Sequence, residues 1–256
     1  LVAEVRPDVI YHLAGQADVA ASWLSPIETM RVNVEGTHNI LEVARTFGVA
    51  KVLTVSSADI YGVVAPEELP IVESAPLRPV SPYAASKAAA DLVALQAHLG
   101  HGQDVVRARA FNHLGPGQSK SFVGAGFAAR IAAAERSGDD ELQTGDLTPR
   151  RDFTDVRDVV RAYRLLATEG RPGVAYNICS GTSVSIGELA GLLLGLTDAR
   201  MRLVEDPDLL RPVELPELRG DASLLRRHTG WAPSISLDET LSDVLEDWRL
   251  RLTEAQ

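Results

Sequence analysis

Apolar and polar positions follow two alternating patterns along the first part of the chain. Segments 7–15, 50–57 and 103–112 are mostly apolar and end in small or polar residues, which is typical of buried strands in a parallel sheet. Segment 33–48 repeats apolar residues at helical spacing, and a Ser-Pro pair starts a second helix over 81–95. The order strand, helix, strand, helix, strand predicts right-handed crossovers and a sheet with helices on both faces.

The pattern changes after Gly117. Short helices, isolated strands such as 174–180 and 201–205, and a turn-rich stretch at 205–217 predict a smaller lobe beside the sheet. We therefore expect an α/β chain with a doubly wound parallel sheet and a smaller carboxyl-terminal α/β lobe. The sheet takes residues 1–117, and residues 118–256 form mainly the lobe, with some segments returning to the sheet.

Composition and charge exclude several classes of partner. A formal net charge of −10 disfavours nucleic acid or an anionic membrane, because phosphate-backbone binding needs a basic face. No apolar run approaches the roughly 18 residues that span a bilayer. The single cysteine, Cys179, rules out an internal disulfide and fits a reducing cytoplasm, and no histidine stands in metal-ligand spacing. We expect a cytoplasmic protein with no metal, nucleic acid or membrane partner.

Candidate chemistry gathers at the carboxyl ends of the predicted strands, where open parallel sheets bind their ligands. Segment 50–57 ends in Ser57, and the next helix carries Tyr83 and Lys87 four residues apart, on one face. A phenol with a pKa of about 10 transfers protons poorly at neutral pH, and a nearby cation lowers that pKa. With a serine hydroxyl to orient a carbonyl or alcohol, this group predicts an alcohol and ketone redox site. The alternative is an incidental Tyr-Lys pair on a solvated helix.

Short motifs along the chain match one enzyme family. The sequence resembles the extended short-chain dehydrogenases/reductases, which include sugar-nucleotide epimerases, dehydratases and reductases. The matching stretches occur in the family's order over nearly the whole chain: HLAG (12–15), NVEGT (33–37), SSADIYG (56–62), SPYAASK (81–87), RAFNHLGPGQ (109–118), RDFTDVRD (151–158), YNICSG (176–181) and RPVELPELRGD (211–221).

The resemblance implies catalytic and cofactor roles for individual residues. Tyr83 is the expected acid-base residue, Ser57 takes the family's Ser/Thr position, and Lys87 is expected to bind the nicotinamide ribose and tune Tyr83. Asp59 stands where the family's dehydratases have a proton-transferring glutamate. NAD(P)H is the implied cofactor, with expected binding positions at Ala14, Gly15, Asn33, Val55, Tyr83, Lys87 and His113.

The implied substrate is a nucleotide-sugar, GDP-linked in the nearest part of the family. In the resemblance, Arg151 and Arg211 face its pyrophosphate, since arginine clamps phosphate oxygens bidentately. Asn112 is an expected contact to the sugar nucleotide, and Glu214 to the nucleoside hydroxyls. From the residues alone, a solvated surface charge is the alternative for Arg151. For His113 the alternative is a loop histidine held by backbone groups, and His12 is interpreted as structural.

The motifs also favour one reaction within the family. Segments 111–119, 151–158, 176–181 and 210–218 match reductases of GDP-linked 4-keto sugars better than GDP-mannose 4,6-dehydratases. The expected reaction of the full-length parent is the NAD(P)H-dependent reduction of the 4-keto group of a GDP-4-keto-6-deoxy-hexose to GDP-rhamnose. A nucleotide-sugar 4,6-dehydratase and a 4-epimerase stay open as alternatives. The alanine-rich helix implies close packing on the sheet and, as in many relatives, a homodimer.

One departure from the family pattern concerns the amino terminus. The family begins with a strand and a Gly-rich turn that approaches the cofactor pyrophosphate, and no such turn stands near residue 1. The stretch GAGFAAR at 124–130 follows no sheet strand. We therefore expect the Rossmann-like sheet to lack its first strands and to expose a strand edge. A catalytically inactive fragment or a sugar-nucleotide binding protein is the corresponding alternative function.

Overall fold

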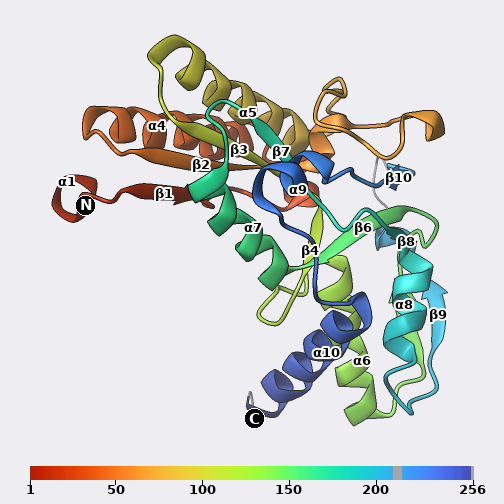
Figure 1. Cartoon of the computed structure of the whole chain (residues 1–256). Coiled ribbons are helices and arrows are strands. Elements are labelled where there is room, and N and C mark those ends of the chain that lie inside the picture. Colours follow the sequence, from red (N-terminus) through yellow and green to blue (C-terminus); the bar gives the residue numbers. More distant parts are fainter. Residues whose placement is uncertain (210–214, 255–256) are drawn as a thin grey trace.

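The computed structural model describes residues 1–209 and 215–254, in which a parallel sheet with flanking helices stands beside a second group of strands and helices (Figure 1). The strands are β1 (Val9–His12), β2 (Lys51–Ser57), β3 (Val105–Ala110), β4 (Asn112–Leu114), β5 (Glu141–Thr144), β6 (Arg150–Asp155), β7 (Ala175–Ile178), β8 (Ser183–Ser185), β9 (Arg202–Glu205) and β10 (Glu217–Leu218). The α-helices are α1 (Val2–Val5), α2 (Val19–Leu24), α3 (Pro26–Met30), α4 (Gly36–Thr46), α5 (Pro82–His101), α6 (Val123–Ser137), α7 (Val156–Glu169), α8 (Ile186–Leu194), α9 (Ser223–Thr229) and α10 (Leu237–Glu254). Short helical turns are η1 (Arg31–Glu35), η2 (Ala58–Tyr61), η3 (Pro66–Glu68) and η4 (Pro207–Leu209).

The main sheet has the strand order β1-β2-β3-β7, and all of its pairs are parallel. The three strands predicted from the apolar runs are present. The prediction that 174–180 is an isolated strand is wrong, because β7 pairs with β3 in a register that places Ala175 opposite Arg107. Segment 201–205 is not isolated either, since β9 pairs with β5.

Helices cover both faces of this sheet, because neighbouring strand residues point in opposite directions. On one face, Val52 belongs to an apolar cluster with Leu41 of α4 and Ala94 of α5. On the other face, Leu53 belongs to a cluster with Val159 of α7. Figure 1 shows α4 and α5 on one side of the strands and α7 on the other. The sheet is therefore the Rossmann-like α/β arrangement that the sequence predicts.

Helix α5 has clear local signals at both ends. The Ser81 side chain accepts a hydrogen bond from the Ala84 amide at 3.1 Å, and Pro82 occupies the first turn, where its missing N–H costs nothing. The helix ends at Gly102, which adopts the left-handed conformation that glycine tolerates best. These signals fix the start of the helix immediately before Tyr83 and so fix where its side chain leaves the helix.

The helix predicted over 33–48 begins earlier in the structure. Helix α3 starts at Pro26 and continues through the π-helical turn η1 into α4. Asn33 lies in this π-helical turn and is 2% exposed. A π-turn inserts an extra residue into the helical repeat and often marks a functional site, here at a position expected to bind cofactor.

The second group of strands and helices is built on β6. Strands β10, β6 and β4 form one sheet, β8 pairs antiparallel with β6, and β5 and β9 form a separate pair. Its apolar core joins Phe127 of α6, Leu189 of α8 and Leu241 of α10. The prediction of only short helices is wrong here, because α6 has 15 residues and α10 has 18, and their apolar faces pack in one cluster.

Candidate active site

Ser57 and Tyr83 meet where β2 ends and α5 begins. Ser57 is the last residue of β2 and caps the turn η2, in which its side chain accepts a hydrogen bond of 3.2 Å from the Asp59 amide. The Ser57 hydroxyl also lies close enough to the phenol of Tyr83, which is 8% exposed, to lower the pKa of that phenol. The two residues that the sequence predicts as a pair therefore share one site.

Burial governs the ionisation of Tyr83. Loss of solvent raises the pKa of the phenol well above its ordinary value, and the Asp59 carboxylate raises the same pKa further. The Ser57 hydroxyl lowers the pKa but does not offset these effects. The expectation that Lys87 makes this phenol acidic is therefore wrong for this structure, because desolvation outweighs the favourable contacts of the phenolate.

Lys87 lies one turn further along α5 and reaches back to the sheet. Its ammonium donates a hydrogen bond of 2.8 Å to the carbonyl oxygen of Val55, and burial lowers the pKa of the Lys87 side chain to about 8. The side chain is 9% exposed. Lys87 therefore brings a partly desolvated cation to the end of β2, beside the Ser57–Tyr83 pair.

Asn33 organises the loop that follows β1. Its side-chain oxygen accepts a hydrogen bond from the Gln16 amide at 2.8 Å, and its Nδ2 donates to the Gln16 carbonyl at 3.0 Å and to Ser86 Oγ at 2.8 Å. A Cβ added at Gly15 would lie 3.0 Å from Asn33 Oδ1 and 3.6 Å from Lys87 Nζ. The structure thus brings Gly15, Asn33 and Lys87 together, with Ala14 exposed next to them.

The histidines of the motifs have different surroundings. His12, at the end of β1, pairs with Thr37 Oγ1 at 3.1 Å, and burial together with the charge of Lys87 lowers its pKa. His113, in β4, is half-buried, and its Nδ1 lies 3.2 Å from the carbonyl oxygen of Phe111. Burial lowers the pKa of His113 and so favours the neutral ring. Asn112 is also half-buried and lies opposite Phe153 in the β4–β6 pair.

The positions expected to bind the pyrophosphate are only partly described. Arg151 is 6% exposed, so the alternative of a solvated surface charge is wrong. Its Nη1 donates hydrogen bonds to the carbonyl oxygens of Arg150 at 2.8 Å and Leu215 at 2.7 Å, which ties β6 to the start of the segment from 215. Arg211 and Glu214 lie outside the described residues.

Sequence reasoning missed a charged network behind the site. Arg107 and Arg109 on β3 both bind Asp91 on α5, and Arg109 also binds Tyr61 in η2. Two signals were available in the sequence: two arginines in an otherwise apolar strand, and an aspartate four residues after Lys87, on the helix face of Tyr83 and Lys87.

Comparison with known proteins places the chain in a family. The family model described as GDP-mannose 4,6 dehydratase matches residues 1–244. The chain belongs to this family. Its members are extended short-chain dehydrogenases/reductases, NAD(P)-dependent enzymes with a Rossmann-like fold, as the motifs of the chain imply.

Relatives in the GDP-mannose 4,6 dehydratase family and related enzymes differ in reaction. The chain is 40% identical over 250 residues to the GDP-6-deoxy-D-mannose reductase of Pseudomonas aeruginosa, which covers 97% of this chain and 82% of the relative. It is 35% identical over 238 residues to a dTDP-glucose 4,6-dehydratase of Streptomyces griseus, covering 92% and 70%. The structure of RMD from Pseudomonas aeruginosa complexed with NADPH matches with a TM-score of 0.90 and 40% identity, over 96% of this chain and 82% of that chain. The UDP-glucose 4-epimerase of Thermotoga maritima with UDP-glucose matches with a TM-score of 0.89 and 28% identity, over 96% and 79%.

The residues around Lys87 fit the nicotinamide-ribose end of NAD(P)H. The ammonium of Lys87 can donate to ribose hydroxyls, and Gly15 leaves room beside it that a larger side chain would fill. Structures of related proteins are complexed with NADPH or with NAD. The described residues contain no group of three or more His, Cys, Asp or Glu side chains that could hold a metal ion. Among these same residues, no helix is long and apolar enough to cross a membrane.

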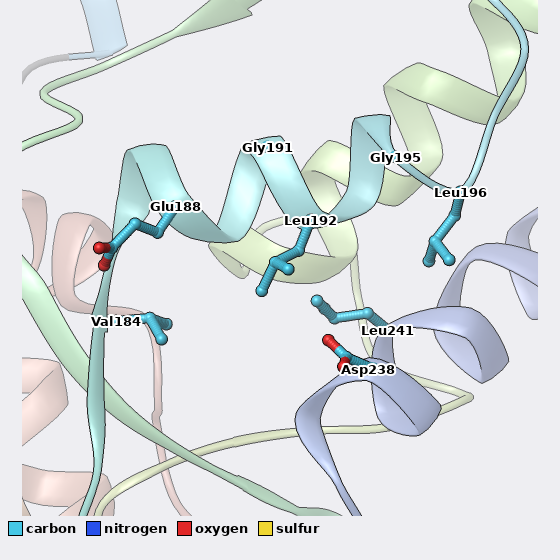
Figure 2. A pocket seen from close by; sticks show the side chains of 8 residues that line it. All are labelled: Val184, Glu188, Gly191, Leu192, Gly195, Leu196, Asp238 and Leu241. Atoms are coloured by element: carbon cyan, nitrogen blue, oxygen red, sulfur yellow. The ribbon is translucent and has the colours of Figure 1, made fainter.

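A separate hollow lies away from these residues. It has a volume of about 670 Å³ and opens between α8 and α10, with Leu192, Leu196 and Leu241 on its walls (Figure 2). Its polar groups are the carboxylates of Glu188 and Asp238, which come from different helices. None of the predicted site residues that the structure describes lines it. Because it offers neither the hydroxyl nor the phenol of a redox site, we place the candidate active site at Ser57 and Tyr83.

Proposed function

We propose that this chain carries the catalytic group of a reductase that converts the 4-keto group of a GDP-4-keto-6-deoxy-hexose to the alcohol, giving GDP-rhamnose with NAD(P)H as reductant. The contact between Ser57 and Tyr83, beside the Lys87 cation, carries the proposal. The 40% identity to the GDP-6-deoxy-D-mannose reductase of Pseudomonas aeruginosa, over 97% of the chain, supports the choice of substrate.

The ionisation of Tyr83 supports its role as the acid of a reduction. When bound, NAD(P)H would supply the hydride for C4 of the sugar. Tyr83 donates its phenolic proton to O4 as negative charge develops there, and Ser57 donates a hydrogen bond to the same oxygen. The raised pKa of Tyr83 keeps the phenol protonated at neutral pH, which is the form that a reduction needs. Lys87, whose ammonium is held at the carbonyl oxygen of Val55, binds the ribose hydroxyls of the cofactor in this proposal.

Other residues belong to this proposal as substrate and cofactor contacts. Ala14, Gly15, Asn33, Val55 and His113 stay predictions as cofactor-binding positions, and Asn112, Arg151, Arg211 and Glu214 as substrate-binding positions. For Arg151 the structure adds two backbone acceptors, so we expect it to hold the segment from Leu215 as well as the pyrophosphate. The homodimer and the cytoplasmic location also stay predictions.

The replacement of Tyr83 by phenylalanine tests the proposal. The oxidation of NADPH by GDP-4-keto-6-deoxymannose, followed at 340 nm, should slow by about 100-fold or more in Tyr83→Phe, as is typical when a general acid is removed. Tyr11→Phe changes an exposed tyrosine on β1 and serves as the matched control, with a rate equal to that of the wild type. A rate in Tyr83→Phe close to that of the control would refute the proposal.

A nucleotide-sugar 4,6-dehydratase is the second candidate. The carboxylate of Asp59 acts on Tyr83 electrostatically, and dehydratases are among the relatives. A dehydratase would convert GDP-mannose to the 4-keto product without net consumption of NADPH, whereas the reductase consumes one NADPH per sugar. A 4-epimerase would do neither and would interconvert two GDP-hexoses. Incubation with each substrate, followed by absorbance at 340 nm and by product analysis, separates the three reactions. A sugar-nucleotide binding protein would bind NADPH or GDP-sugar without turnover.

A further inference from the structure

Asp91 joins the helix of Tyr83 and Lys87 to β3. It lies four residues after Lys87 on α5 and is 1% exposed. Arg107 donates from Nη1 to Asp91 Oδ2 at 2.5 Å. Arg109 donates to both carboxylate oxygens, from Nε to Oδ1 at 3.2 Å and from Nη2 to Oδ2 at 2.9 Å. Two arginines of β3 thus hold α5 through one buried carboxylate.

Arg109 also reaches the turn that follows Ser57. Its Nη1 donates to the phenolic oxygen of Tyr61 at 3.0 Å and to the carbonyl oxygen of Glu73 at 2.8 Å. Tyr61 is the last residue of η2, which starts directly after Ser57, and its hydroxyl donates to Asn177 Oδ1 at 2.7 Å. One guanidinium group therefore contacts α5, which carries Tyr83, and η2, which begins directly after Ser57.

We propose that Arg109 is a positioning residue that sets the spacing between Ser57 and Tyr83. A guanidinium presents its donors in a rigid plane, so it can hold a carboxylate along one edge and a phenol oxygen from another nitrogen at a fixed separation. Arg109 is 5% exposed and Tyr61 is fully buried, so water does not compete for these bonds. The proposal rests on the proposed function only in that Ser57 and Tyr83 carry the reaction.

Arg107 provides a matched control within the same network. It binds the same carboxylate as Arg109, lies two residues earlier on the same face of β3, and is also buried. Its other hydrogen bond goes to the carbonyl oxygen of Gly173 at 2.9 Å, on the side away from η2. A role limited to neutralising Asp91 would make the two arginines equivalent, whereas a positioning role distinguishes them.

The experiment compares Tyr61→Phe and Arg109→Lys with Arg107→Lys. The chain has five tyrosines, so labelling with [¹³Cζ]tyrosine gives few signals, and Tyr83→Phe assigns the one of interest. Ser57→Ala gives the position of that signal when the Ser57 hydroxyl is absent. We expect the Tyr83 signal to move towards that position in Tyr61→Phe and Arg109→Lys, and to stay at the wild-type position in Arg107→Lys.

Kinetics provide the second readout. With GDP-4-keto-6-deoxymannose, kcat should fall about tenfold in Tyr61→Phe and Arg109→Lys, with KM within about twofold of the wild type, since a small displacement of reacting groups slows catalysis more than binding. Arg107→Lys should keep kcat. If Arg109→Lys does not fold, Tyr61→Phe alone tests the inference, because this variant removes only a hydroxyl group. An unchanged Tyr83 signal in Tyr61→Phe, or an equal shift in Arg107→Lys, would overturn the inference. A wild-type chain without turnover would refute the proposed function. The Tyr83 signal would still test whether Arg109 is a positioning residue, because that signal does not depend on turnover.

Discussion

The Nζ atom of Lys87 lies 2.8 Å from the carbonyl oxygen of Val55 and donates a hydrogen bond to it. This hydrogen bond connects the second turn of α5 to β2 near its carboxyl end and fixes the position of the ammonium group. It does not compensate for the water that the ammonium loses, because burial lowers the pKa of Lys87 to about 8. Burial of the Lys87 ammonium, which is expected to assist catalysis, therefore reduces the stability of the folded protein.

The contribution of Lys87 to the stability of the protein should become less unfavourable between about pH 8 and the unfolded pKa of lysine. The lowered pKa means that, in this range, the unfolded chain binds a proton at Lys87 that the folded chain does not, so the free energy of unfolding rises with pH. Below pH 8 both states carry the charge, and the full penalty of about 3 kcal/mol applies. Lys87→Met removes this penalty. In urea unfolding at pH 7, Lys87→Met should have a higher free energy of unfolding than the wild type. Towards pH 10.5 this difference should decrease by about 3 kcal/mol, because the wild type loses its penalty.

A surface lysine serves as the control for this experiment. Lys120→Met changes an exposed lysine in the loop before α6 and should leave the free energy of unfolding within about 0.5 kcal/mol of the wild type at neutral pH. If the difference between Lys87→Met and the wild type does not change with pH, the ammonium of Lys87 is not desolvated as described.

Asn33→Ala should weaken the binding of NADPH. Asn33 makes three hydrogen bonds that connect η1 to the loop at Gln16 and to Ser86 of α5. Without them the loop that carries Gly15 loses its anchor, so we expect the Kd for NADPH to rise about tenfold and the free energy of unfolding to fall by about 2 kcal/mol. Fluorescence titration and urea unfolding measure the two effects.

The matched control for this variant is Asn39→Ala. Asn39 lies six residues later and is exposed on α4. Its replacement should leave the affinity for NADPH unchanged and the free energy of unfolding within about 0.5 kcal/mol. Equal affinities in the two variants would show that Asn33 has no part in cofactor binding.

Asp59→Asn should separate the two candidate reactions. The Asp59 carboxylate raises the pKa of Tyr83, so its loss should lower that pKa and move the alkaline limit of the reduction to lower pH. A reductase should keep a rate within about tenfold of the wild type, because Asp59 donates no proton in the proposed step. A dehydratase that uses this carboxylate for proton transfer should lose about 100-fold or more. The pH dependence of kcat with both substrates distinguishes these results.

Two glycines should respond in opposite directions to replacement by alanine. A Cβ at Gly220 would lie 2.6 Å from Phe111 and 2.7 Å from Cys179 Sγ, so Gly220→Ala should destabilise the protein by about 1–3 kcal/mol through overpacking. Gly191, in the interior of α8, has nothing within 4 Å of an added Cβ, and Gly191→Ala should stabilise by about 0.5–1 kcal/mol. Thermal unfolding measures both, and a destabilised Gly191→Ala would contradict the open space that the structure shows beside Gly191.

Local patterns were sufficient for the elements of the first half of the chain. Apolar runs predict β1, β2 and β3, and the Ser-Pro pair predicts α5, because the signals for these elements lie within a few neighbouring residues. The pair of Ser57 and Tyr83 was also predictable, since parallel strands place their carboxyl ends at one edge. The place of β7 was not, because a short apolar run does not indicate which strand it will pair with.

The electrostatics of the site also depend partly on local sequence and partly on the whole fold. The spacing of Tyr83 and Lys87 predicts that both side chains face one site, and this is determined by the helical repeat alone. The pKa values depend on burial, which is set by the whole fold, and burial reverses the expected effect on Tyr83. The contacts of Arg109 with α5 and η2 likewise form only when β3 packs beside both elements.

By itself, the sequence determined the strands β1, β2 and β3, the helix α5, the chemical groups of the site and the family to which the chain belongs, because each follows from residue types at short, regular spacing. Only the tertiary structure decided which groups lose water and which distant segments meet. Both depend on packing between elements far apart in the chain, and such packing leaves no periodic signal in the sequence.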